Sequence, residues 1–336
     1  MTITMVDEQD NLESIIDDEI ELEVTPEDLL EYKRFDHFLA AKCPHISRSL
    51  LKKLFQNGSI TSDVTLEIRK MPNPGTKICV KVPPPLPEKA VAENIPLDII
   101  FEDDHFIVIN KKAGMVTHPG AGNISGTLVN AILHHYPKMQ EMTDAKRPGV
   151  AHRLDKGTSG LIIMAKYQKS LEELMLLFSS RQIEKYYHTL VMGTKINPVG
   201  SITTTIARHP TNRLKMAANV KDGKEAITHY QVLKTFEKMT YLQIKLETGR
   251  THQIRVHMAQ ELRHAVLGDS LYGNPKQDLQ RLGDPFKSLI GDYPYPFLHA
   301  QKIKFIHPFT KKEMEFEAEK PEIFLKVLEL AQNGNL

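Results

Sequence analysis

The chain of 336 residues contains very little cysteine and no long apolar run. Its two cysteines, Cys43 and Cys79, lack the spacing of a thiolate metal site and fit a reducing cytosol. No segment approaches the ~18 consecutive apolar residues that a membrane span requires. The N-terminus is acidic, whereas a secretory signal begins with a basic segment and continues with an apolar one. We therefore expect no such signal and a cytoplasmic protein.

A large net charge is also absent, because the formal total is +1. That total hides an asymmetry. Residues 1–30 hold eleven acidic residues and no Lys or Arg, which leaves +12 on the remainder of the chain. Residues 31–89 carry eleven basic residues against five acidic ones. A basic body behind an acidic segment is compatible with a polyanionic partner.

Composition divides the chain into four segments. Residues 1–30 are interpreted as a largely flexible acidic tail with one short helix near residues 26–30, and residues 31–82 as a small separate module. The run Pro83-Pro84-Pro85-Leu86-Pro87 favours an extended chain that cannot join a central sheet, so residues 83–94 are interpreted as a linker. Residues 95–331 then form the main domain.

The small module is predicted to contain two helices followed by short strands near residues 60–64 and 77–82. Ser47 can cap the second helix, which has one apolar and one basic face. The apolar stripe consists of Leu50, Leu51, Leu54 and Phe55, and the basic face of Arg48, Lys52 and Lys53.

The main domain mixes strand and helix signals without a regular alternation. Apolar runs at 106–109 and 161–165 predict buried strands, and residues 168–180 have the periodicity of an amphipathic helix. Residues 226–236 and 241–246 are typical of paired strands. This pattern indicates an α+β fold with a mixed, mostly antiparallel sheet.

The most informative segment is His152-Arg153-Leu154-Asp155-Lys156-Gly157-Thr158-Ser159-Gly160-Leu161. It places the Asp155 carboxylate between two cations and just before a glycine-containing turn, which an apolar run follows. This arrangement suits a nucleophile that must be ionised and held still. From these residues alone, a local turn-capping role for Asp155 remains an alternative.

This segment resembles the signature of the RluA family of pseudouridine synthases. Residues 110–119, 248–257, 267–272 and 298–308 resemble further signatures of the family, in the expected order. The layout of residues 31–82 resembles the S4 RNA-binding module, although Thr61-Ser62-Asp63 replaces the usual Val-Asn-Gly turn. The resemblance implies a pseudouridine synthase fold whose sheet is flanked by helices, preceded by an S4-like module.

The resemblance also implies roles for individual residues. Asp155 would be the catalytic residue, and Arg255 the cation that keeps the buried carboxylate ionised. Tyr187 would stack on a uridine flipped out of folded RNA, with Tyr186 as the alternative, because strand alternation separates the two only weakly. The expected RNA contacts are Arg153, Arg250 and Lys166 in the main domain, and Arg48, Lys52 and Lys53 in the small module.

Pseudouridine formation breaks the bond between uracil N1 and C1′, turns the base and rejoins it through C5. Since no redox step is needed, we expect no cofactor. Attack by the carboxylate at C6, attack at C1′ and a glycal route all remain open. No metal is expected, because His152, His252 and His257 lack the spacing of a zinc site.

The module and the loop at residues 118–123 most resemble the D type of the family, which acts on large-subunit ribosomal RNA. The implied substrate is therefore that RNA, with transfer RNA as the second candidate. We expect a monomer whose partners are RNA and, as a further candidate, pre-ribosomal particles. Two other classes are alternatives: a catalytically silent RNA-binding or ribosome-assembly protein, and an aspartyl-phosphate enzyme, which the absence of a membrane span disfavours.

Overall fold

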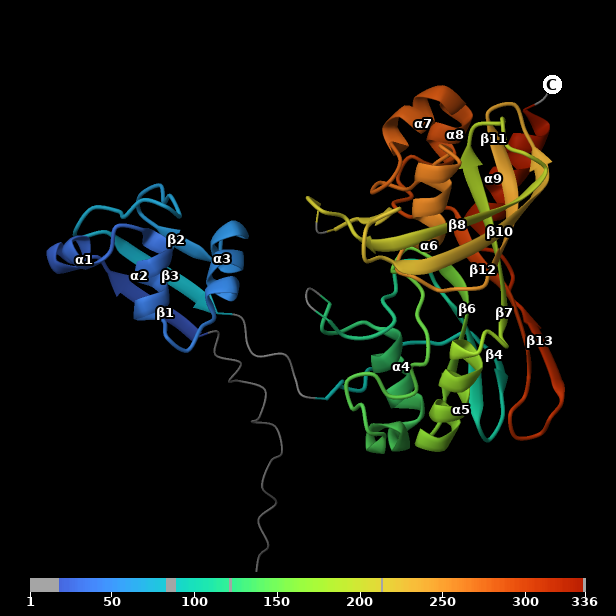
Figure 1. Cartoon of the computed structure of the whole chain (residues 1–336), viewed down its shortest axis with the longest axis horizontal. Coiled ribbons are helices and arrows are strands. Elements are labelled where there is room, and N and C mark those ends of the chain that lie inside the picture. Colours follow the sequence, from blue (N-terminus) through green and yellow to red (C-terminus); the bar gives the residue numbers. More distant parts are fainter. Residues whose placement is uncertain (1–17, 83–88, 121–122, 213, 335–336) are drawn as a thin grey trace, which may run out of the picture. The chain divides into compact units, whose positions relative to one another are not determined.

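The computed structural model describes residues 18–82, 89–120, 123–212 and 214–334 (Figure 1). The chain separates into two compact units, Met1–Leu86 and Pro87–Leu336. No helix in the described ranges is long and apolar enough to cross a membrane.

In the described part of the first unit, helices pack on a small antiparallel sheet with strand order β1-β3-β2. The predicted cap is present, because the Ser47 side chain accepts a hydrogen bond from the Leu50 N–H at 3.3 Å. The core is built on Phe35, Phe38 and Leu54. The elements are β1 (Asp18–Glu23), α1 (Pro26–Glu31), α2 (Phe35–Lys42), α3 (Arg48–Gln56), β2 (Ile60–Ser62) and β3 (Lys77–Val82).

The expected boundary of the acidic tail at residue 30 is wrong. Strand β1 pairs with β3 along its whole length, and helix α1 follows it, so residues 18–31 belong to the folded module. The physical reason is the alternation of Ile20 and Leu22 with glutamates, which gives a strand one apolar face despite its net charge. Residues 1–17 of the expected tail lie outside the described residues.

The second unit is built on one large sheet. Its described strands run in the order β4-β5-β6-β12-β7-β11-β10-β8-β9, with β13 beside β12. Every pairing is antiparallel except that of β6 with β12, which confirms the predicted α+β class with a mixed, mostly antiparallel sheet. The strands are β4 (Ile99–Glu102), β5 (Phe106–Lys111), β6 (Ser159–Ala165), β7 (Glu184–Met192), β8 (Val199–Arg208), β9 (Met216–Ala218), β10 (Lys224–Thr235), β11 (Met239–Leu246), β12 (Leu298–Ile306) and β13 (Glu313–Glu317).

Helices cover this sheet in two groups. Figure 1 shows α4 and α5 together beside the end of the sheet that contains β4. Their apolar residues share a core with β5 and β6, whereas α7, α8 and α9 share another with β7 and β11. The helical segments are α4 (Leu128–His135), a 3-10 turn (Pro137–Glu141), α5 (Gln168–Ser179), α6 (Gln253–Val256), a π-helical turn (His257–Glu261), α7 (Pro275–Leu282), α8 (Asp284–Ile290) and α9 (Glu322–Asn333).

The expected linker is also too long at its C-terminal end. Ala90 is buried in the core of the second unit, and its N–H donates to the Ala145 carbonyl at 3.0 Å. The Glu93 N–H donates to the Asn130 carbonyl at 2.9 Å. Residues 89–94 therefore belong to the second unit, because these backbone groups and the Ala90 methyl have partners there. Residues 83–88 lie outside the described ranges.

The single parallel pairing depends on a glycine. Gly160 has φ +107°, and a Cβ at this position would lie 2.2 Å from the Ala300 carbonyl oxygen. The absence of a side chain lets β12 approach β6 immediately after the turn that carries Asp155. This close approach joins the two halves of the sheet next to the Asp155 segment.

We predict that Gly160→Ala destabilises the second unit by about 3 kcal/mol or more, because it adds a steric clash to an unfavourable φ. Gly126→Ala is the matched control: its φ is +68°, but nothing lies within 4 Å of the added Cβ. The control should lose about 1 kcal/mol. Chemical denaturation measures both, and equal losses would contradict the importance of the contact with Ala300.

Candidate active site

Asp155 is held on a turn that is fixed from two sides. Thr117 Oγ1 donates to the Leu154 carbonyl at 3.0 Å and accepts from the Leu154 N–H at 3.3 Å. The Thr158 N–H donates to the Asp155 carbonyl at 3.0 Å. The backbone of the turn is thus tied to the core, while the Asp155 side chain keeps 16% of its surface exposed.

Arg255 approaches Asp155 from α6, but its main partner is another carboxylate. Its Nη1 lies 3.5 Å from Asp155 Oδ2, a long contact. Its Nε and Nη2 donate to the two oxygens of Asp269 at 2.7 and 2.9 Å. The bidentate pair fixes the plane of the guanidinium. One edge of a largely buried, oriented cation consequently faces the Asp155 carboxylate.

Asp269 was not predicted to have a role beyond its place in a family-like segment. It is fully buried and also accepts hydrogen bonds from the N–H groups of Leu271 and Tyr272 at 2.9 and 3.0 Å. Burial alone would raise the pKa of Asp269, but the Arg255 hydrogen bonds and charge and these two N–H groups lower it below its ordinary value. Asp269 is therefore an anion that holds Arg255 in place.

Tyr187 lies on β7 opposite Ile244 of β11 and Ala300 of β12, and it is 8% exposed. Burial, and then the negative charge of Asp155, raises the pKa of its phenol, so Tyr187 stays protonated. Tyr186 faces the other side of the sheet, where its hydroxyl donates to Glu184. The structure thus places Tyr187, not Tyr186, next to Asp155.

Lys111 is a buried cation whose importance the sequence did not reveal. It ends β5 opposite Gly160 and is 1% exposed. Its ammonium donates to the carbonyls of Lys112 and Met115 at 3.0 and 2.9 Å. Burial lowers the pKa of Lys111 to about 7, an effect that the Asp155 charge opposes. The available signal was strand alternation, because Lys111 lies two residues after Ile109 and therefore on the same face of β5 as Ile107 and Ile109.

His252 completes the surroundings of the carboxylate. It has φ +56°, which brings its Nε2 to 3.8 Å from Asp155 Oδ2. Because the Tyr272 oxygen accepts from the Met216 N–H at 2.7 Å, we assign its proton to the 2.8 Å bond with His252 Nδ1. The imidazole N–H is then on Nε2 and faces Asp155, although the distance exceeds that of a direct hydrogen bond. Burial lowers the pKa of His252, and the Asp155 charge opposes this effect.

The three histidines considered as metal ligands have separate partners. His152 Nε2 accepts from the Ile163 N–H at 3.0 Å. His257 is bonded to Thr204 and Thr228 at 2.9 Å each. Within the described ranges, no group of three or more His, Cys, Asp or Glu side chains is placed to hold a metal ion.

The side chains around Asp155 enclose a small pocket of about 80 Å³. It brings together five of the nine residues expected at the site. These are Arg153, Asp155, Tyr187, Arg250 and Arg255.

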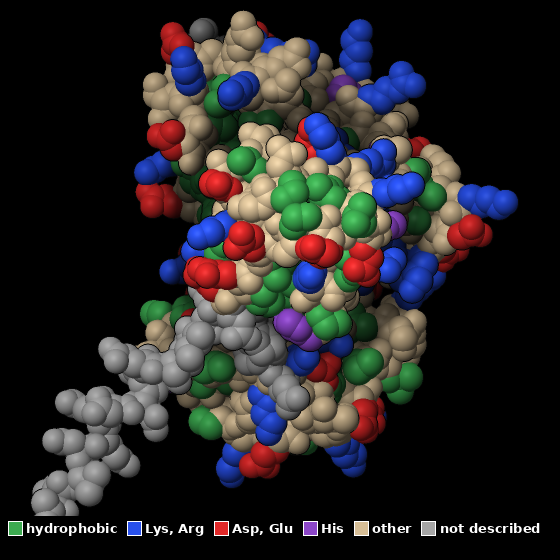
Figure 2. Space-filling model, turned by 90° about the vertical axis from the view of Figure 1, so that its left-hand side faces the viewer, with side chains coloured by type: hydrophobic (Ala, Val, Ile, Leu, Met, Phe, Trp, Pro, Cys, Tyr) green, Lys and Arg blue, Asp and Glu red, His purple; other side chains and the backbone are tan. Residues whose placement is uncertain are grey.

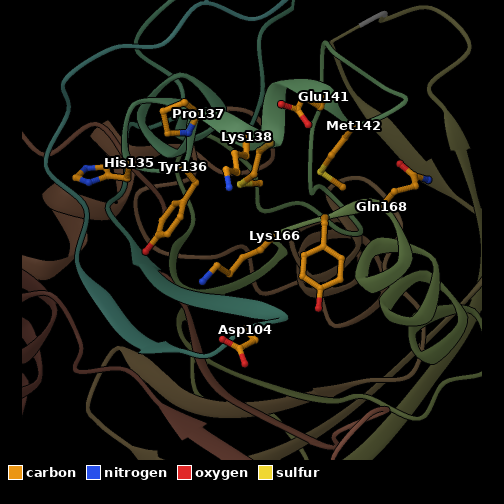
Figure 3. A pocket seen from close by; sticks show the side chains of 11 residues that line it. Asp104, His135, Tyr136, Pro137, Lys138, Glu141, Met142, Lys166 and Gln168 are labelled. Carbon is orange, nitrogen blue, oxygen red and sulfur yellow. The ribbon is translucent and has the colours of Figure 1, made fainter.

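Lys166 is not part of this group, because it follows the opposite end of β6. Its ammonium is bound by Glu102 and the Asp103 carbonyl at 2.7 and 2.8 Å, and lies 5.1 Å from the centre of the Tyr136 ring. Figure 3 shows Lys166 extending toward Tyr136 in a separate hollow of about 600 Å³. That hollow is larger than the pocket at Asp155, but it contains none of the residues around the carboxylate.

The other three expected contacts lie in the first unit, on α3. Arg48, Lys52 and Lys53 are all exposed. In the described part of the chain none of them pairs with a carboxylate, so their charges are available to a partner. Figure 2 shows Lys and Arg side chains interspersed with Asp and Glu among the described residues that are in view.

Comparisons with known proteins identify the family to which the chain belongs. Residues 105–260 match the family model of RNA pseudouridylate synthase. The chain is 41% identical to an uncharacterized RNA pseudouridine synthase of Aquifex aeolicus (strain VF5), covering 88% of this chain and 93% of that protein. It is 39% identical to ribosomal large subunit pseudouridine synthase D of Xylella fastidiosa (strain Temecula1 / ATCC 700964), covering 88% of each.

The fold has a solved counterpart in human RNA pseudouridylate synthase domain containing 4. The TM-score is 0.55 at 23% identity, and the match covers 70% of this chain and 93% of that chain. This similarity supports the fold alone, whereas the sequence relatives span nearly the whole chain. The chain belongs to the RNA pseudouridylate synthase family.

Proposed function

We propose that this pseudouridine synthase modifies uridines in large-subunit ribosomal RNA, with Asp155 as the nucleophile. The observation that carries the proposal is the pairing of a braced, 16% exposed carboxylate with the free edge of the largely buried Arg255 guanidinium. Relatives such as the Xylella fastidiosa protein are named as ribosomal large subunit enzymes, which supports the choice of RNA.

The reaction needs an ionised carboxylate and little else. The bond between N1 and C1′ breaks, the bond between C5 and C1′ forms, and the hydrogen on C5 leaves as a proton while N1 gains one. No electron donor is required. Asp155 can attack C6 or C1′, or assist a glycal route, and the positive edge of Arg255 stabilises its charged form in each case.

The remaining site residues would receive the base. The target uridine must leave the RNA stack to reach Asp155, and a flipped base needs an aromatic or apolar surface. The ring of Tyr187 supplies this surface in our proposal. Its hydroxyl stays protonated, so it acts as a hydrogen-bond donor or acceptor and not as an anion. Arg153 and Arg250, at the mouth of the pocket, would bind the RNA backbone.

The first unit would add affinity rather than chemistry. Its layout resembles an S4 module, and the exposed cations of α3 are free to bind phosphates. We further propose that the enzyme acts as a monomer in the cytoplasm, on ribosomal RNA that is free or in assembling particles. Lys166 is omitted from the proposed RNA contacts, because Glu102 binds its ammonium.

Asp155→Asn should reduce tritium release from 5-tritiated uridine in large-subunit ribosomal RNA by about 10⁴-fold or more, as expected when a nucleophile is lost. Binding of the same RNA should persist, because the backbone contacts remain. The parent enzyme is assayed in parallel on the same RNA and on bulk transfer RNA. If the parent releases tritium from transfer RNA alone, the substrate assignment is overturned. No release from either RNA, with binding intact, would favour a silent RNA-binding protein.

Asp269→Asn should lower the free energy of unfolding by about 3 kcal/mol, because Arg255 loses its buried counter-charge. It should also lower kcat by about 10²-fold through misplacement of the guanidinium. The pKa of Asp269 is depressed in the folded protein, so its contribution to stability is present above about pH 4 and is lost as pH falls further. Denaturation at pH 7 and at low pH, together with single-turnover assays, measures these effects.

The control for this variant is Asp278→Asn on α7. Asp278 is also buried, but burial raises its pKa to about 6, and its Oδ2 has no hydrogen-bond partner in the described residues. Loss of its charge should leave stability at pH 7 unchanged or higher. If the two variants lose the same free energy of unfolding, the loss in Asp269→Asn does not come from the ion pair between Arg255 and Asp269.

Replacing Arg48, Lys52 and Lys53 with Gln should weaken RNA binding. It should also reduce the magnitude of the negative slope of log K against log salt by about 2. The matched control replaces Lys276, Arg281 and Lys287, three exposed cations on α7 and α8. Filter binding over a salt series measures both variants. Equal losses of RNA affinity in the two variants would mean that the cations of α3 act only through the net charge of the protein.

A further inference from the structure

A second cavity adjoins the pocket at Asp155. It has a volume of about 480 Å³ and shares Arg153, Tyr187 and Arg250 with the smaller pocket. If a base stacks on Tyr187, the sugar and phosphate attached to it would therefore lie at the entrance of this cavity. Its walls also include Lys185, Phe178 and His152.

Lys185 is the unusual member of this lining. It precedes Tyr187 by two residues on β7, so both side chains lie on the same face of the strand. The residue is 7% exposed, and its ammonium lies 5.7 Å from the centre of the Phe178 ring. In residues 18–82, 89–120, 123–212 and 214–334, no carboxylate or carbonyl accepts a hydrogen bond from it. A buried ammonium without such partners is unfavourable.

The charges around Lys185 increase the free-energy cost of burying its ammonium. Burial lowers the pKa of Lys185 to about 8, and the positive charges of Arg181 and Arg250 add to the effect. Glu247 is the carboxylate in the lining, but it is bound by His229 and Arg181 at 2.7 and 3.3 Å. The cavity thus has an excess of positive charge, which an anion would neutralise.

The neighbouring imidazole of His152 neither carries a charge nor accepts a hydrogen bond from Lys185. His152 accepts the Ile163 N–H through Nε2, and its ring packs on Phe178 with 4.4 Å between the ring centres. Burial, and then the charge of Lys185, lowers the pKa of His152 to about 3, so the ring stays neutral. The two rings form one wall of the cavity, and the Lys185 ammonium lies over the Phe178 ring.

We propose that this cavity is a phosphate subsite, in which Lys185 binds a backbone phosphate of the RNA strand next to the flipped-out uridine. The subsite rests on the proposed RNA reaction, because the cavity opens beside the base pocket. Phosphate oxygens would supply the acceptors that the ammonium lacks in the protein alone. An unpaired buried cation is then a binding residue kept at the expense of stability.

Lys185→Met separates this role from a structural one. Met has a similar length and no charge, so removal of the unpaired ammonium should leave the melting temperature unchanged or raise it. RNA affinity at low salt should fall about tenfold, because a charge-assisted contact is lost. The slope of log K against log salt should fall by about 0.7, the contribution of one phosphate. In turnover assays the loss should appear in KM rather than in kcat.

Lys169→Met is the matched control, because Lys169 is an exposed lysine on α5 of the same unit and does not line the cavity. It removes the same charge and should leave the salt slope nearly unchanged. Binding is measured in an Asp155→Asn background, so the result does not depend on turnover. A failure of the tritium assay would therefore count against the proposed reaction and not against the subsite.

The proposal is overturned if Lys185→Met lowers the melting temperature while affinity and salt slope stay as in the parent, since Lys185 is then structural. A collapse of kcat with an unchanged KM also overturns it. Should the Met variant fail to fold, Lys185→Gln is measured in the same way. Inorganic phosphate is the second probe: if it stabilises the parent but the RNA slope is equal in both proteins, the site binds free phosphate and the RNA assignment fails.

Discussion

The active site depends on the ion pair between Arg255 and Asp269. Asp269 is fully buried, and Arg255 uses two of its donors to bind it, so the direction of the third nitrogen is determined before any substrate arrives. This preorganisation lets a single 3.5 Å contact with Asp155 act as a fixed electrostatic field. The carboxylate that we propose as the nucleophile, Asp155, is therefore not the one that holds the arginine.

Much of the fold could be predicted from local pattern. The Ser47 cap, the basic face of α3, the buried run of β6 and the antiparallel pair β10–β11 all depend on neighbouring residues, which a sequence shows directly. The acidic segment was misjudged because its charge was counted, whereas the alternation of Ile20 and Leu22 with glutamates decided the structure. The class of sheet followed from the irregular order of strands and helices.

The site itself was predictable only where a motif named its residues. Asp155 and Arg255 are 100 positions apart, and nothing local to either one indicates the contact. The roles of Asp269 and Lys111 depend on which backbone groups surround them after folding, so charge and spacing could not reveal them. Lys166 shows the converse: a cation close to the motif in sequence is carried along β6 to a carboxylate far from the reaction.

Strand β7 fixes the spacing between the backbone positions of Lys185 and Tyr187. Alternate residues of a strand lie about 7 Å apart on one face, so the Cα atoms of Lys185 and Tyr187 have a spacing that the backbone fixes. Lengthening β7 by one residue between them would move one of the two to the opposite face, where Tyr186 lies. Insertions and deletions should therefore be excluded from this stretch during evolution, even where single substitutions are tolerated.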